Sequence, residues 1–234
     1  MSTNKLTSGI IIVPVYNEDP LVLQRTVGGL LGKSYSVLVV DDGSTPPVQL
    51  NFKTERLKVI RHCLNLGQGA ALQTGITYAL LHQKSWCVSF DADGQHSPTE
   101  IPSLLQPIWD GDANITFGSR FVRPADRKAI PVSRRMILLL GRIFNGLMTG
   151  IWMTDAHNGF RAFDQQAMHY LQLKENRMAY ATELLWQLRK AKLNWKEVPV
   201  HITYSPYSLK KGQSSWQAVR IASDVVLRLI FRGS

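Results

Sequence analysis

Short apolar segments alternate with amphipathic segments along the first half of the chain. Apolar stretches bounded by turn residues predict strands, at 9–15, 36–40, 57–60, 86–90 and 113–117. Apolar residues at the three- and four-residue spacing of helices lie between them, at 20–31, 68–82 and 101–109. Strands that alternate with helices predict an α/β fold, in which a mainly parallel sheet has helices on both faces.

The second half follows a different pattern after a charged, proline-flanked segment at 124–131. It predicts helices and a strand, at 133–148, 181–191 and 195–204. The C-terminal segment is amphipathic, with polar residues at every fourth position opposite an apolar side, namely Arg220, Asp224, Arg228 and Arg232. We therefore expect one domain over residues 1–215, followed by an amphipathic helix over 216–234 that is not a separate domain.

Composition narrows the class of protein. Of the 234 residues, 44% are hydrophobic and 19% are charged, which allows a large core and argues against disorder. The 27 Lys and Arg against 17 Asp and Glu give a net charge of +10, which suits an anionic membrane surface, a polyanion or a phosphorylated substrate. No Lys/Arg run is long enough to indicate a nucleic-acid tail, so nucleic acid is not an expected partner.

The sequence predicts a cytoplasmic protein that is soluble or peripheral to a membrane. Cys63 and Cys87 are isolated, which is typical of buried thiols in a reducing compartment. The apolar run at 9–15 has no cleavage site after it, so we expect a strand and not a signal peptide. No run reaches the roughly 20 apolar residues that span a bilayer.

Two carboxylates, Asp91 and Asp93, directly follow the apolar segment at 86–90. Neighbouring carboxylates repel and resist ionisation unless a cation or strong donors lie between them. Mg²⁺ and Mn²⁺ take oxygen ligands and keep positions open for phosphate, so the pair predicts a metal site to which Gln95 adds an amide oxygen. An ordinary acidic turn is the alternative, because Asp and Gly favour turns. His96 is expected to be a turn histidine, because oxygen ligands suit such a metal better.

Two further polar motifs follow predicted strands. Asp41 in VLVVDDGST can accept a hydrogen bond from a ribose hydroxyl or a base N–H, and Tyr16 in PVYNE can stack on a base. A capped turn between strand and helix is the alternative for each. Ligands of parallel sheets bind beyond the carboxyl ends of the strands, so these motifs and the Asp91–Asp93 pair are expected to share one site.

The chain resembles the family 2 glycosyltransferases in an ordered series of stretches, IIVPVYNE, VLVVDDGST, NLGQGAALQTG, FDADGQHSP, GSRF, DAHNGFRAF and EVPVHITY. The likeness covers nearly the whole chain and is greatest to the branch that contains the polyprenyl-phosphate sugar synthases. It implies a GT-A fold, which is a Rossmann-like, nucleotide-sugar-binding sheet. It also implies a divalent metal, Mg²⁺ or Mn²⁺, and inversion at the anomeric carbon.

The same resemblance assigns roles on the donor side. It implies that the nucleotide sugar contacts Pro14, Tyr16, Glu18, Asp41, Asp91 and Ala92. Asp91, Asp93 and Gln95 match the metal site, with Asp93 central to catalysis. A metal that bridges the diphosphate neutralises the charge that grows on the leaving nucleoside diphosphate. Lys210 and Lys211 lie in a basic loop that closes over this diphosphate in the family.

The resemblance to the polyprenyl-phosphate branch also implies roles on the acceptor side. It implies that Arg120 in GSRF and Arg134 in VSRRM contact the acceptor phosphate, whose oxygens suit guanidinium forks; a solvated surface charge is the alternative for each. A phosphate acceptor is already an anion, whereas a hydroxyl acceptor needs a base. Glu183 and Asp155 are the candidate bases, although Thr182 before Glu183 also suits the start of a helix.

The leading hypothesis is a metal-dependent, inverting glycosyltransferase that moves a sugar from a UDP- or GDP-sugar to a polyprenyl phosphate in cell-envelope glycan assembly. The alternative acceptor is a saccharide hydroxyl. The predicted helices at 133–148 and 216–234 favour a peripheral position at the cytoplasmic face of an anionic membrane, unless they pack on the protein's own core.

Two functions of another class compete with this hypothesis. A phosphatase of the haloacid dehalogenase type also has a D-x-D-G turn after an apolar strand. There the motif usually lies early in the chain, whereas here it is central, is followed by Gln95, and leaves PVYNE and DDGST without a role. A non-catalytic basic module that binds nucleic acid or membrane is the second competitor.

Overall fold

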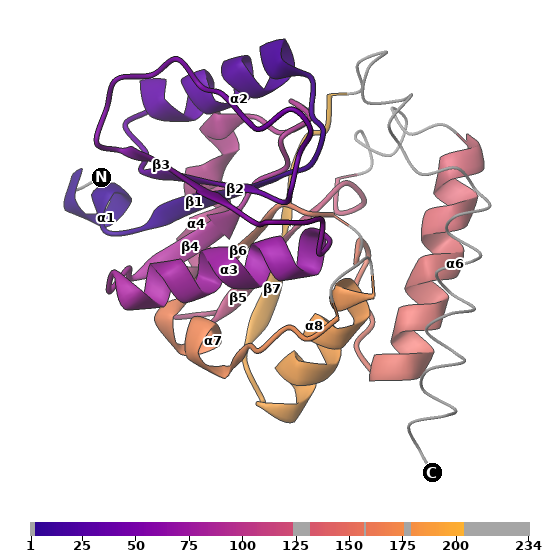
Figure 1. The fold of residues 1–234 in the computed structure, drawn as a ribbon. Helices are drawn as coiled ribbons and strands as arrows, with labels where there is room; N and C mark the ends of the chain where they lie inside the picture. Colours follow the sequence, from indigo (N-terminus) through magenta and orange to yellow (C-terminus); the bar gives the residue numbers. More distant parts are fainter. Residues whose placement is uncertain (1–2, 124–131, 157, 176–178, 204–234) are drawn as a thin grey trace.

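The computed structural model describes residues 3–123, 132–156, 158–175 and 179–203 (Figure 1). Its strands are β1 Ile10–Val15, β2 Val37–Asp41, β3 Leu57–Arg61, β4 Trp86–Ser89, β5 Ile115–Ser119, β6 Arg161–Asp164 and β7 Trp195–Pro199. Its helices are α1 Thr3–Thr7, α2 Pro20–Gly32, α3 Gln68–Leu81, α4 Ile101–Trp109, α6 Val132–Thr149, α7 Gln165–Tyr170 and α8 Tyr180–Lys190, with a 3₁₀ helix, η1 Pro98–Glu100.

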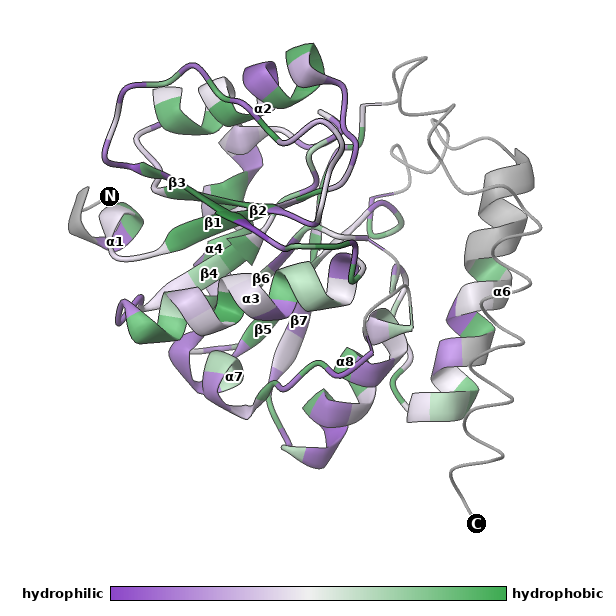
Figure 2. Cartoon of the chain, in the orientation of Figure 1, coloured by the Kyte–Doolittle hydropathy of each residue, from purple (hydrophilic) through white to green (hydrophobic). Residues whose placement is uncertain are grey.

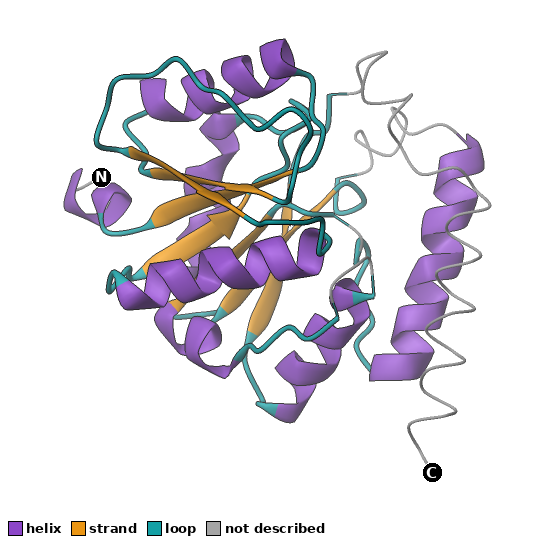
Figure 3. Ribbon diagram, viewed as in Figure 1, coloured by secondary structure: helices purple, strands orange, loops and turns teal. Residues whose placement is uncertain are grey.

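Within these residues the strands form one seven-stranded sheet in the order β3-β2-β1-β4-β6-β5-β7 (Figure 3). Neighbouring strands are parallel except at β6, which runs antiparallel to β4 and β5. The strands β1, β2, β4, β5 and β7 therefore end at one edge of the sheet, and β6 begins there. The predicted mainly parallel α/β sheet is confirmed, and this edge is where ligands bind in such sheets.

Helices cover both faces of the sheet. On one face α3, α7 and α8 pack on a core that includes Ile10 and Ile12. On the other face α2 and α4 pack on Ile11 and Val13. Successive side chains of a strand point to opposite faces, so a strand covered on both sides needs an unbroken apolar run. Figure 2 shows β1 mainly in the hydrophobic colour, whereas the helices mix hydrophobic and hydrophilic residues.

Most of the predicted elements are confirmed to within a few residues. The helix predicted at 101–109 is α4, and those at 133–148 and 181–191 are α6 and α8. The strand predicted at 195–204 is shorter, because β7 ends at Pro199, which has no N–H to donate to a sheet. The hydrophobic pattern does not predict α1, β6 and α7, since each is too short to show a period.

The two cysteines are free thiols in different surroundings. Cys87 is buried in β4, as expected, whereas Cys63 is exposed. The prediction of two buried thiols is therefore wrong for Cys63. This residue comes just after β3, the edge strand of the sheet, where the chain lies on the surface.

Helix α6 lies beside the body of the fold and contacts α8 (Figure 1). Thr182 Oγ1 donates to Asn145 Oδ1 at 2.7 Å, and Arg189 Nη1 donates to the Thr149 carbonyl at 2.8 Å. Several of its apolar side chains are exposed, namely Leu139, Ile143, Leu147 and Met148. Among the helices of the described ranges, none is long and apolar enough to cross a membrane. The amphipathic helix predicted at 216–234 lies outside the described residues.

Candidate active site

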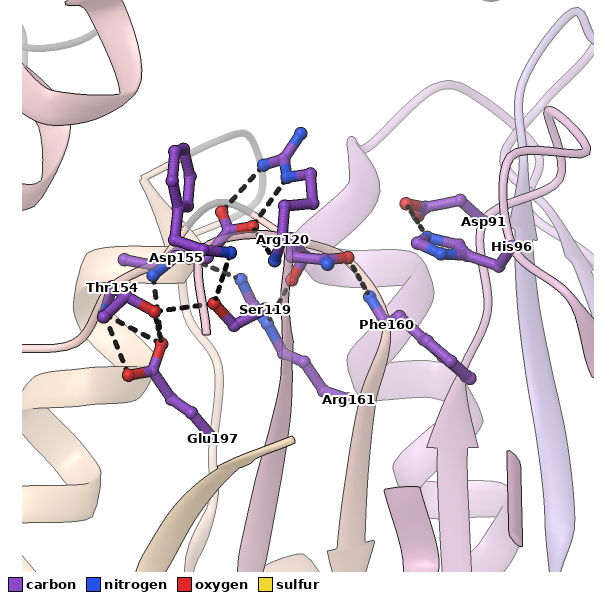
Figure 4. Close-up of polar contacts among 12 residues, drawn as sticks. Asp91, His96, Ser119, Arg120, Thr154, Asp155, Phe160, Arg161 and Glu197 are labelled. Carbon is purple, nitrogen blue, oxygen red and sulfur yellow. Dashed lines mark hydrogen bonds and ion pairs between the residues drawn. The ribbon is translucent and has the colours of Figure 1, made fainter. Parts of the chain in front are cut away.

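The polar motifs that follow the strands meet at one edge of the sheet. PVYNE follows β1, Asp41 ends β2, DADGQ follows β4 and Arg120 follows β5. Because β6 is antiparallel, the segment 158–160 enters the same edge just before β6 begins. Figure 4 shows Asp91, Arg120 and Asp155 together there. The sheet topology thus brings distant parts of the chain into one site.

Two polar side chains contact the carboxylate of Asp91. Gln68 Nε2 donates to its Oδ1 at 3.3 Å, and His96 Nε2 lies 3.2 Å from its Oδ2. A Cβ placed on Gly159 would clash with both carboxylate oxygens. A larger residue there would force the Asp91 carboxylate to shift, so the glycine of the NGFR stretch lets the segment before β6 pass this close to Asp91.

The imidazole of His96, one of the two side chains that contact Asp91, is buried. The residue is 7% exposed, its ring packs on Phe160 with centroids 4.8 Å apart, and the edge of Phe90 meets it at 5.6 Å. The prediction of a turn histidine is therefore incomplete, because the ring is buried and supports Asp91. The sequence places His96 near the motif, but only the packing of Phe160 shows that its ring turns inward.

The surroundings keep Asp91 ionised. Burial favours its neutral acid, but the hydrogen bond and charge of His96, together with the charges of two arginines, outweigh burial and lower the pKa of Asp91. These arginines are Arg161 and Arg120. Arg161 is itself buried and is held by the loop before it, where its Nε and Nη2 each donate to a backbone carbonyl at 2.9 Å.

For Asp93, the effects that raise the pKa of the carboxyl outweigh those that lower it. Burial, and then the negative charges of Asp91 and Glu18, raise the pKa of Asp93 to about 6. This happens although the Gln95 N–H donates to Asp93 Oδ1 at 3.1 Å. Gly94 takes φ +73°, a conformation that favours glycine and lets the turn close. A cation beside Asp93 would offset the repulsion that raises its pKa.

The donor atoms of this turn fit a hard divalent cation. The carboxylates of Asp91 and Asp93 and the amide oxygen of Gln95 are all oxygen ligands of the kind that Mg²⁺ and Mn²⁺ take. In the part of the chain that the structure describes, no group of three or more His, Cys, Asp and Glu side chains is arranged to hold a metal. A cation at DADGQ would therefore complete its shell with substrate oxygens and water.

Asp41, the predicted ligand of the nucleotide, shapes the turn after β2. It is 1% exposed, and its carboxylate accepts from the N–H groups of Ser44 at 2.8 Å and Val48 at 3.1 Å. Arg61 Nε lies 3.4 Å from its Oδ2. Burial would raise the pKa of Asp41, but hydrogen bonds from the side chain and backbone of Ser44 and from the backbone of Val48, with the charge of Arg61, lower it overall. The contact between Asp41 and a nucleotide stays a prediction.

The other predicted nucleotide-side residues lie at the neighbouring strand ends. Pro14 lies in β1, and Tyr16, just beyond this strand, is 46% exposed. Glu18 comes shortly before α2, near enough to Asp93 to raise its pKa. Ala92 is buried, and its carbonyl accepts from Thr26 Oγ1 of α2 at 3.3 Å. The ring of Tyr16 is exposed, and the stacking of a base on it stays a prediction.

Asp42 anchors the start of α3, a role that the sequence does not reveal. Its carboxylate accepts from the N–H groups of Leu66 at 3.0 Å and Gly67 at 2.7 Å. Gly67 precedes Gln68, the first residue of α3, whose amide donates to Asp91. The second aspartate of DDGST therefore helps to place the helix that supports the first aspartate of DADGQ.

Arg120 is buried against Asp155. Its Nε donates to Asp155 Oδ2 at 2.6 Å and its Nη2 donates to Oδ1 at 2.7 Å, while its backbone N–H donates to Oδ2 at 3.2 Å (Figure 4). The predicted phosphate-binding arginine and one candidate base therefore form a bidentate ion pair. With 6% exposure, Arg120 is not the solvated surface charge of the alternative interpretation.

Glu197 in β7 supports the loop that carries Asp155. Its carboxylate accepts from the Thr154 N–H at 2.8 Å, from Thr154 Oγ1 at 2.6 Å and from the Asp155 N–H at 3.1 Å. Thr154 Oγ1 also lies 2.6 Å from Ser119 Oγ at the end of β5. Sequence reasoning missed Glu197, although the EVPV stretch marks its position.

Comparison with known proteins decides the family. The sequence profile described as Glycosyl transferase family 2 matches residues 10–171, which is more than half of the chain. The chain is a family 2 glycosyltransferase. The enzyme and the family inferred from the motifs are thereby confirmed, and the phosphatase and the non-catalytic module are wrong. The matched part of this glycosyltransferase includes Asp41, the DADGQ turn, Arg120 and Asp155.

Two relatives of this glycosyltransferase are matched over most of their own length. The UDP-N-acetylglucosamine–dolichyl-phosphate N-acetylglucosaminyltransferase of Methanococcus voltae is 31% identical over 240 residues, covering 94% of both chains. The polyprenol monophosphomannose synthase of Mycolicibacterium smegmatis is 27% identical over 236 residues, covering 96% of this chain and 87% of the relative. These two relatives are named for lipid-phosphate acceptors.

A solved structure confirms the GT-A fold of this glycosyltransferase. The glucosyl-3-phosphoglycerate synthase of Mycobacterium tuberculosis, solved with Mn²⁺, UDP and phosphoglyceric acid, superposes with a TM-score of 0.63. The match covers 90% of this chain and 75% of that one, at 16% sequence identity. At this identity the likeness concerns the fold.

The remaining predicted residues of the glycosyltransferase have other surroundings. Glu183 accepts from the N–H groups of Lys174 at 3.0 Å and Glu175 at 2.8 Å, and from Gln187 Nε2 at 3.1 Å. It therefore holds the segment that precedes α8, and its role as a base stays a prediction. Three predicted side chains lie outside the described residues, namely Arg134, whose backbone belongs to α6, Lys210 and Lys211.

Proposed function

We propose that this glycosyltransferase moves a sugar from a UDP- or GDP-sugar to a polyprenyl phosphate, in cell-envelope glycan assembly. The observation that carries the proposal is the placement of the DADGQ carboxylates and the Arg120 guanidinium at one sheet edge. DADGQ follows β4 and Arg120 follows β5, and β6 alone separates these two strands. The relatives named for dolichyl phosphate and polyprenol support the same class of acceptor.

The donor would bind at the DADGQ end of this edge. Asp91, Asp93 and Gln95 would hold Mg²⁺ or Mn²⁺, which neutralises negative charge on the leaving nucleoside diphosphate when bound. Asp91 is kept ionised for this purpose by His96 and the nearby arginines. Tyr16 offers an exposed ring on which either uridine or guanosine can stack.

The proposed reaction is a single displacement. A phosphate oxygen of the acceptor attacks the anomeric carbon, the bond between that carbon and the donor diphosphate breaks, and the configuration inverts. The phosphate oxygen already carries the electron pair that forms the new bond, so no side chain has to remove a proton. The hydrogen-bonded carboxylates of Asp155 and Glu183 are compatible with this mechanism.

We also propose that the enzyme works as a peripheral protein at the cytoplasmic face of a membrane. Exposed apolar side chains recur at every fourth residue on α6, and an exposed tryptophan follows: Leu139, Ile143, Leu147 and Trp152. The net charge of +10 suits anionic lipid. In this proposal residues 1–215 form the catalytic domain, and 216–234 add an amphipathic helix.

A substrate screen tests the proposal. Full-length protein is incubated with UDP- and GDP-sugars, with Mn²⁺ or Mg²⁺, and with a polyprenyl phosphate or a saccharide acceptor. We expect release of nucleoside diphosphate, and a new glycolipid, that require both the metal and the polyprenyl phosphate. The matched control is a polyprenol of the same length without phosphate. Transfer to a saccharide alone would refute the proposed acceptor, and full activity with excess EDTA would refute the metal.

A further inference from the structure

We propose that Asp155 is a positioning residue that orients Arg120 toward the acceptor phosphate. The inference rests on the proposed function, because it takes Arg120 as the group that meets the acceptor. It gives Asp155 a role other than that of a base. Figure 4 shows the Asp155 carboxylate beside the Arg120 guanidinium at the end of β5.

The fork between the two side chains holds the guanidinium in one plane. Nε and Nη2 of Arg120 reach the two different oxygens of Asp155, at 2.6 and 2.7 Å, so rotation about the end of the side chain is blocked. The backbone N–H of Arg120 donates to the same carboxylate at 3.2 Å. A phosphate therefore meets an arginine that is already ordered, and the entropy of ordering a long side chain is not lost at binding.

A second layer holds Asp155 itself in place. Glu197 accepts from the backbone N–H groups of Thr154 and Asp155 and from the Thr154 hydroxyl. That hydroxyl lies 2.6 Å from Ser119 Oγ, one residue before Arg120. The end of β5, the 154–155 loop and β7 are thus joined by one chain of short hydrogen bonds. Such a support keeps a functional side chain within the narrow range of productive geometry.

The same contacts argue against Asp155 as a base. A general base must lie within hydrogen-bond reach of the proton that it removes. Both oxygens of Asp155 accept from Arg120, and its side chain is 0% exposed. To reach a proton on an acceptor, Asp155 would have to leave Arg120 and thereby leave a buried charge without its partner, which is strongly unfavourable.

A double-mutant cycle on the full-length enzyme tests the inference. Asp155→Asn, Arg120→Lys and the double variant are assayed with polyprenyl phosphate and nucleotide sugar across a pH series. We expect Asp155→Asn to lower kcat/KM for the polyprenyl phosphate about 10- to 100-fold, with an unchanged KM for the nucleotide sugar. The double variant should lose little more than Arg120→Lys, because Asp155 acts through Arg120. The shape of the pH profile should not change.

Two results would overturn the inference. If the losses of Asp155→Asn and Arg120→Lys multiply, Asp155 does not act through Arg120. If Asp155→Asn removes a fall in rate at low pH that the wild type shows, Asp155 is a base. The proposed function is judged separately, because wild-type protein that transfers no sugar to polyprenyl phosphate refutes the acceptor itself.

Glu197→Gln provides a test that does not disturb the buried ion pair directly. It should lower kcat/KM for the polyprenyl phosphate roughly 3- to 10-fold, again without changing the KM for the nucleotide sugar. The control is Asp112→Asn, which removes the charge of another carboxylate that contacts β7, because Asp112 is about half exposed and lies 2.6 Å from Lys196. An effect of Glu197→Gln on the nucleotide sugar alone, or equal effects of the two variants, also overturns the inference.

Discussion

The two ends of the active-site edge handle charge in opposite ways. At the DADGQ end, partial burial and then the negative charges of Asp91 and Glu18 raise the pKa of Asp93 to about 6. At the other end, Arg120 and Asp155 neutralise each other through two contacts of 2.6 and 2.7 Å. The negative charges near Asp93 thus act against its ionisation, whereas the charges of Arg120 and Asp155 neutralise each other.

This difference separates two kinds of functional residue. An unbalanced carboxylate predicts cation binding and a dependence on pH, because the missing charge comes from outside the protein. A balanced, buried ion pair adds little net stability but holds its members in one geometry, so we expect it to control position. The following experiments test each half of this view.

The largest effect is expected for Asp93→Asn. The amide has nearly the same size but lacks the charge that a divalent cation needs, so sugar transfer should fall at least about 10³-fold. Steady-state assays with Mn²⁺ measure the loss, and circular dichroism shows whether the fold is retained. The matched control is Asp110→Asn, since Asp110 is an exposed carboxylate bonded to Gln106 at 2.8 Å. Near-normal turnover by Asp93→Asn would remove the case for a metal at this turn.

Gly159→Ala should have the next largest effect. The added methyl group would meet both oxygens of Asp91, which must shift together with the turn that carries Asp93. We expect transfer to fall about 10- to 100-fold and the free energy of unfolding to fall by about 1–3 kcal/mol. Gly32→Ala is the control, because the added Cβ there would meet nothing within 4 Å apart from its chain neighbours and the backbone of its own helix. Equal activity of the two variants would show that the approach to Asp91 is unimportant.

The free energy of unfolding of the metal-free protein should depend on pH, because the pKa of Asp93 differs between the folded and unfolded states. The folded pKa of about 6 lies above the ordinary 3.8, so the folded protein binds this proton more tightly than the unfolded chain. The contribution of this proton to the stability of the fold is complete below pH 3.8 and is lost as the pH rises through 6. Asp93→Asn should therefore be more stable than wild type at pH 7.5, by about 1–3 kcal/mol, and equal to it near pH 4.

Chemical denaturation in EDTA at several pH values measures this difference. Adding Mn²⁺ should then raise the melting temperature of the wild type but not that of Asp93→Asn, because a ligand stabilises only the state that binds it. A difference in stability that does not vary with pH contradicts the crowding of Asp93 by its neighbours.

The smallest effect is expected for Lys196→Ala. Lys196 pairs with Asp112 at 2.6 Å, but both side chains are about half exposed, so the pair should contribute less than about 1 kcal/mol. Transfer activity should not change. A loss comparable to that of Glu197→Gln, one residue away on β7, would show that any disturbance of this strand affects acceptor use.

Much of the fold could be predicted because its signals are local. The unbroken apolar runs of β1 and β2 and the helical spacing of α4 are visible in single stretches of sequence. The DADGQ turn is local as well, since Asp91, Asp93 and Gln95 lie within five consecutive residues. The four-residue strand β6 carries no such signal, and its place between β4 and β5 depends on the pairing of both neighbours.

The acceptor end could be predicted only as separate residues. Arg120 and Asp155 are 35 positions apart, and Thr154 and Glu197 are 43 apart. No pattern in the chain indicates that these side chains touch. The burial of His96 was hidden for the same reason, because it depends on Phe160 from the segment before β6.

By itself, the sequence determined the alternation of strands and helices, the family and the carboxylate turn at Asp91, because each depends on neighbours along the chain. Only the tertiary structure decided that Arg120 is paired with Asp155, that Glu197 supports them and that Gly159 abuts Asp91. The physical reason is the strand order. An antiparallel β6 between β4 and β5 brings the segment before it to the edge where those strands end, and β7 pairs with β5, which brings Glu197 beside β5.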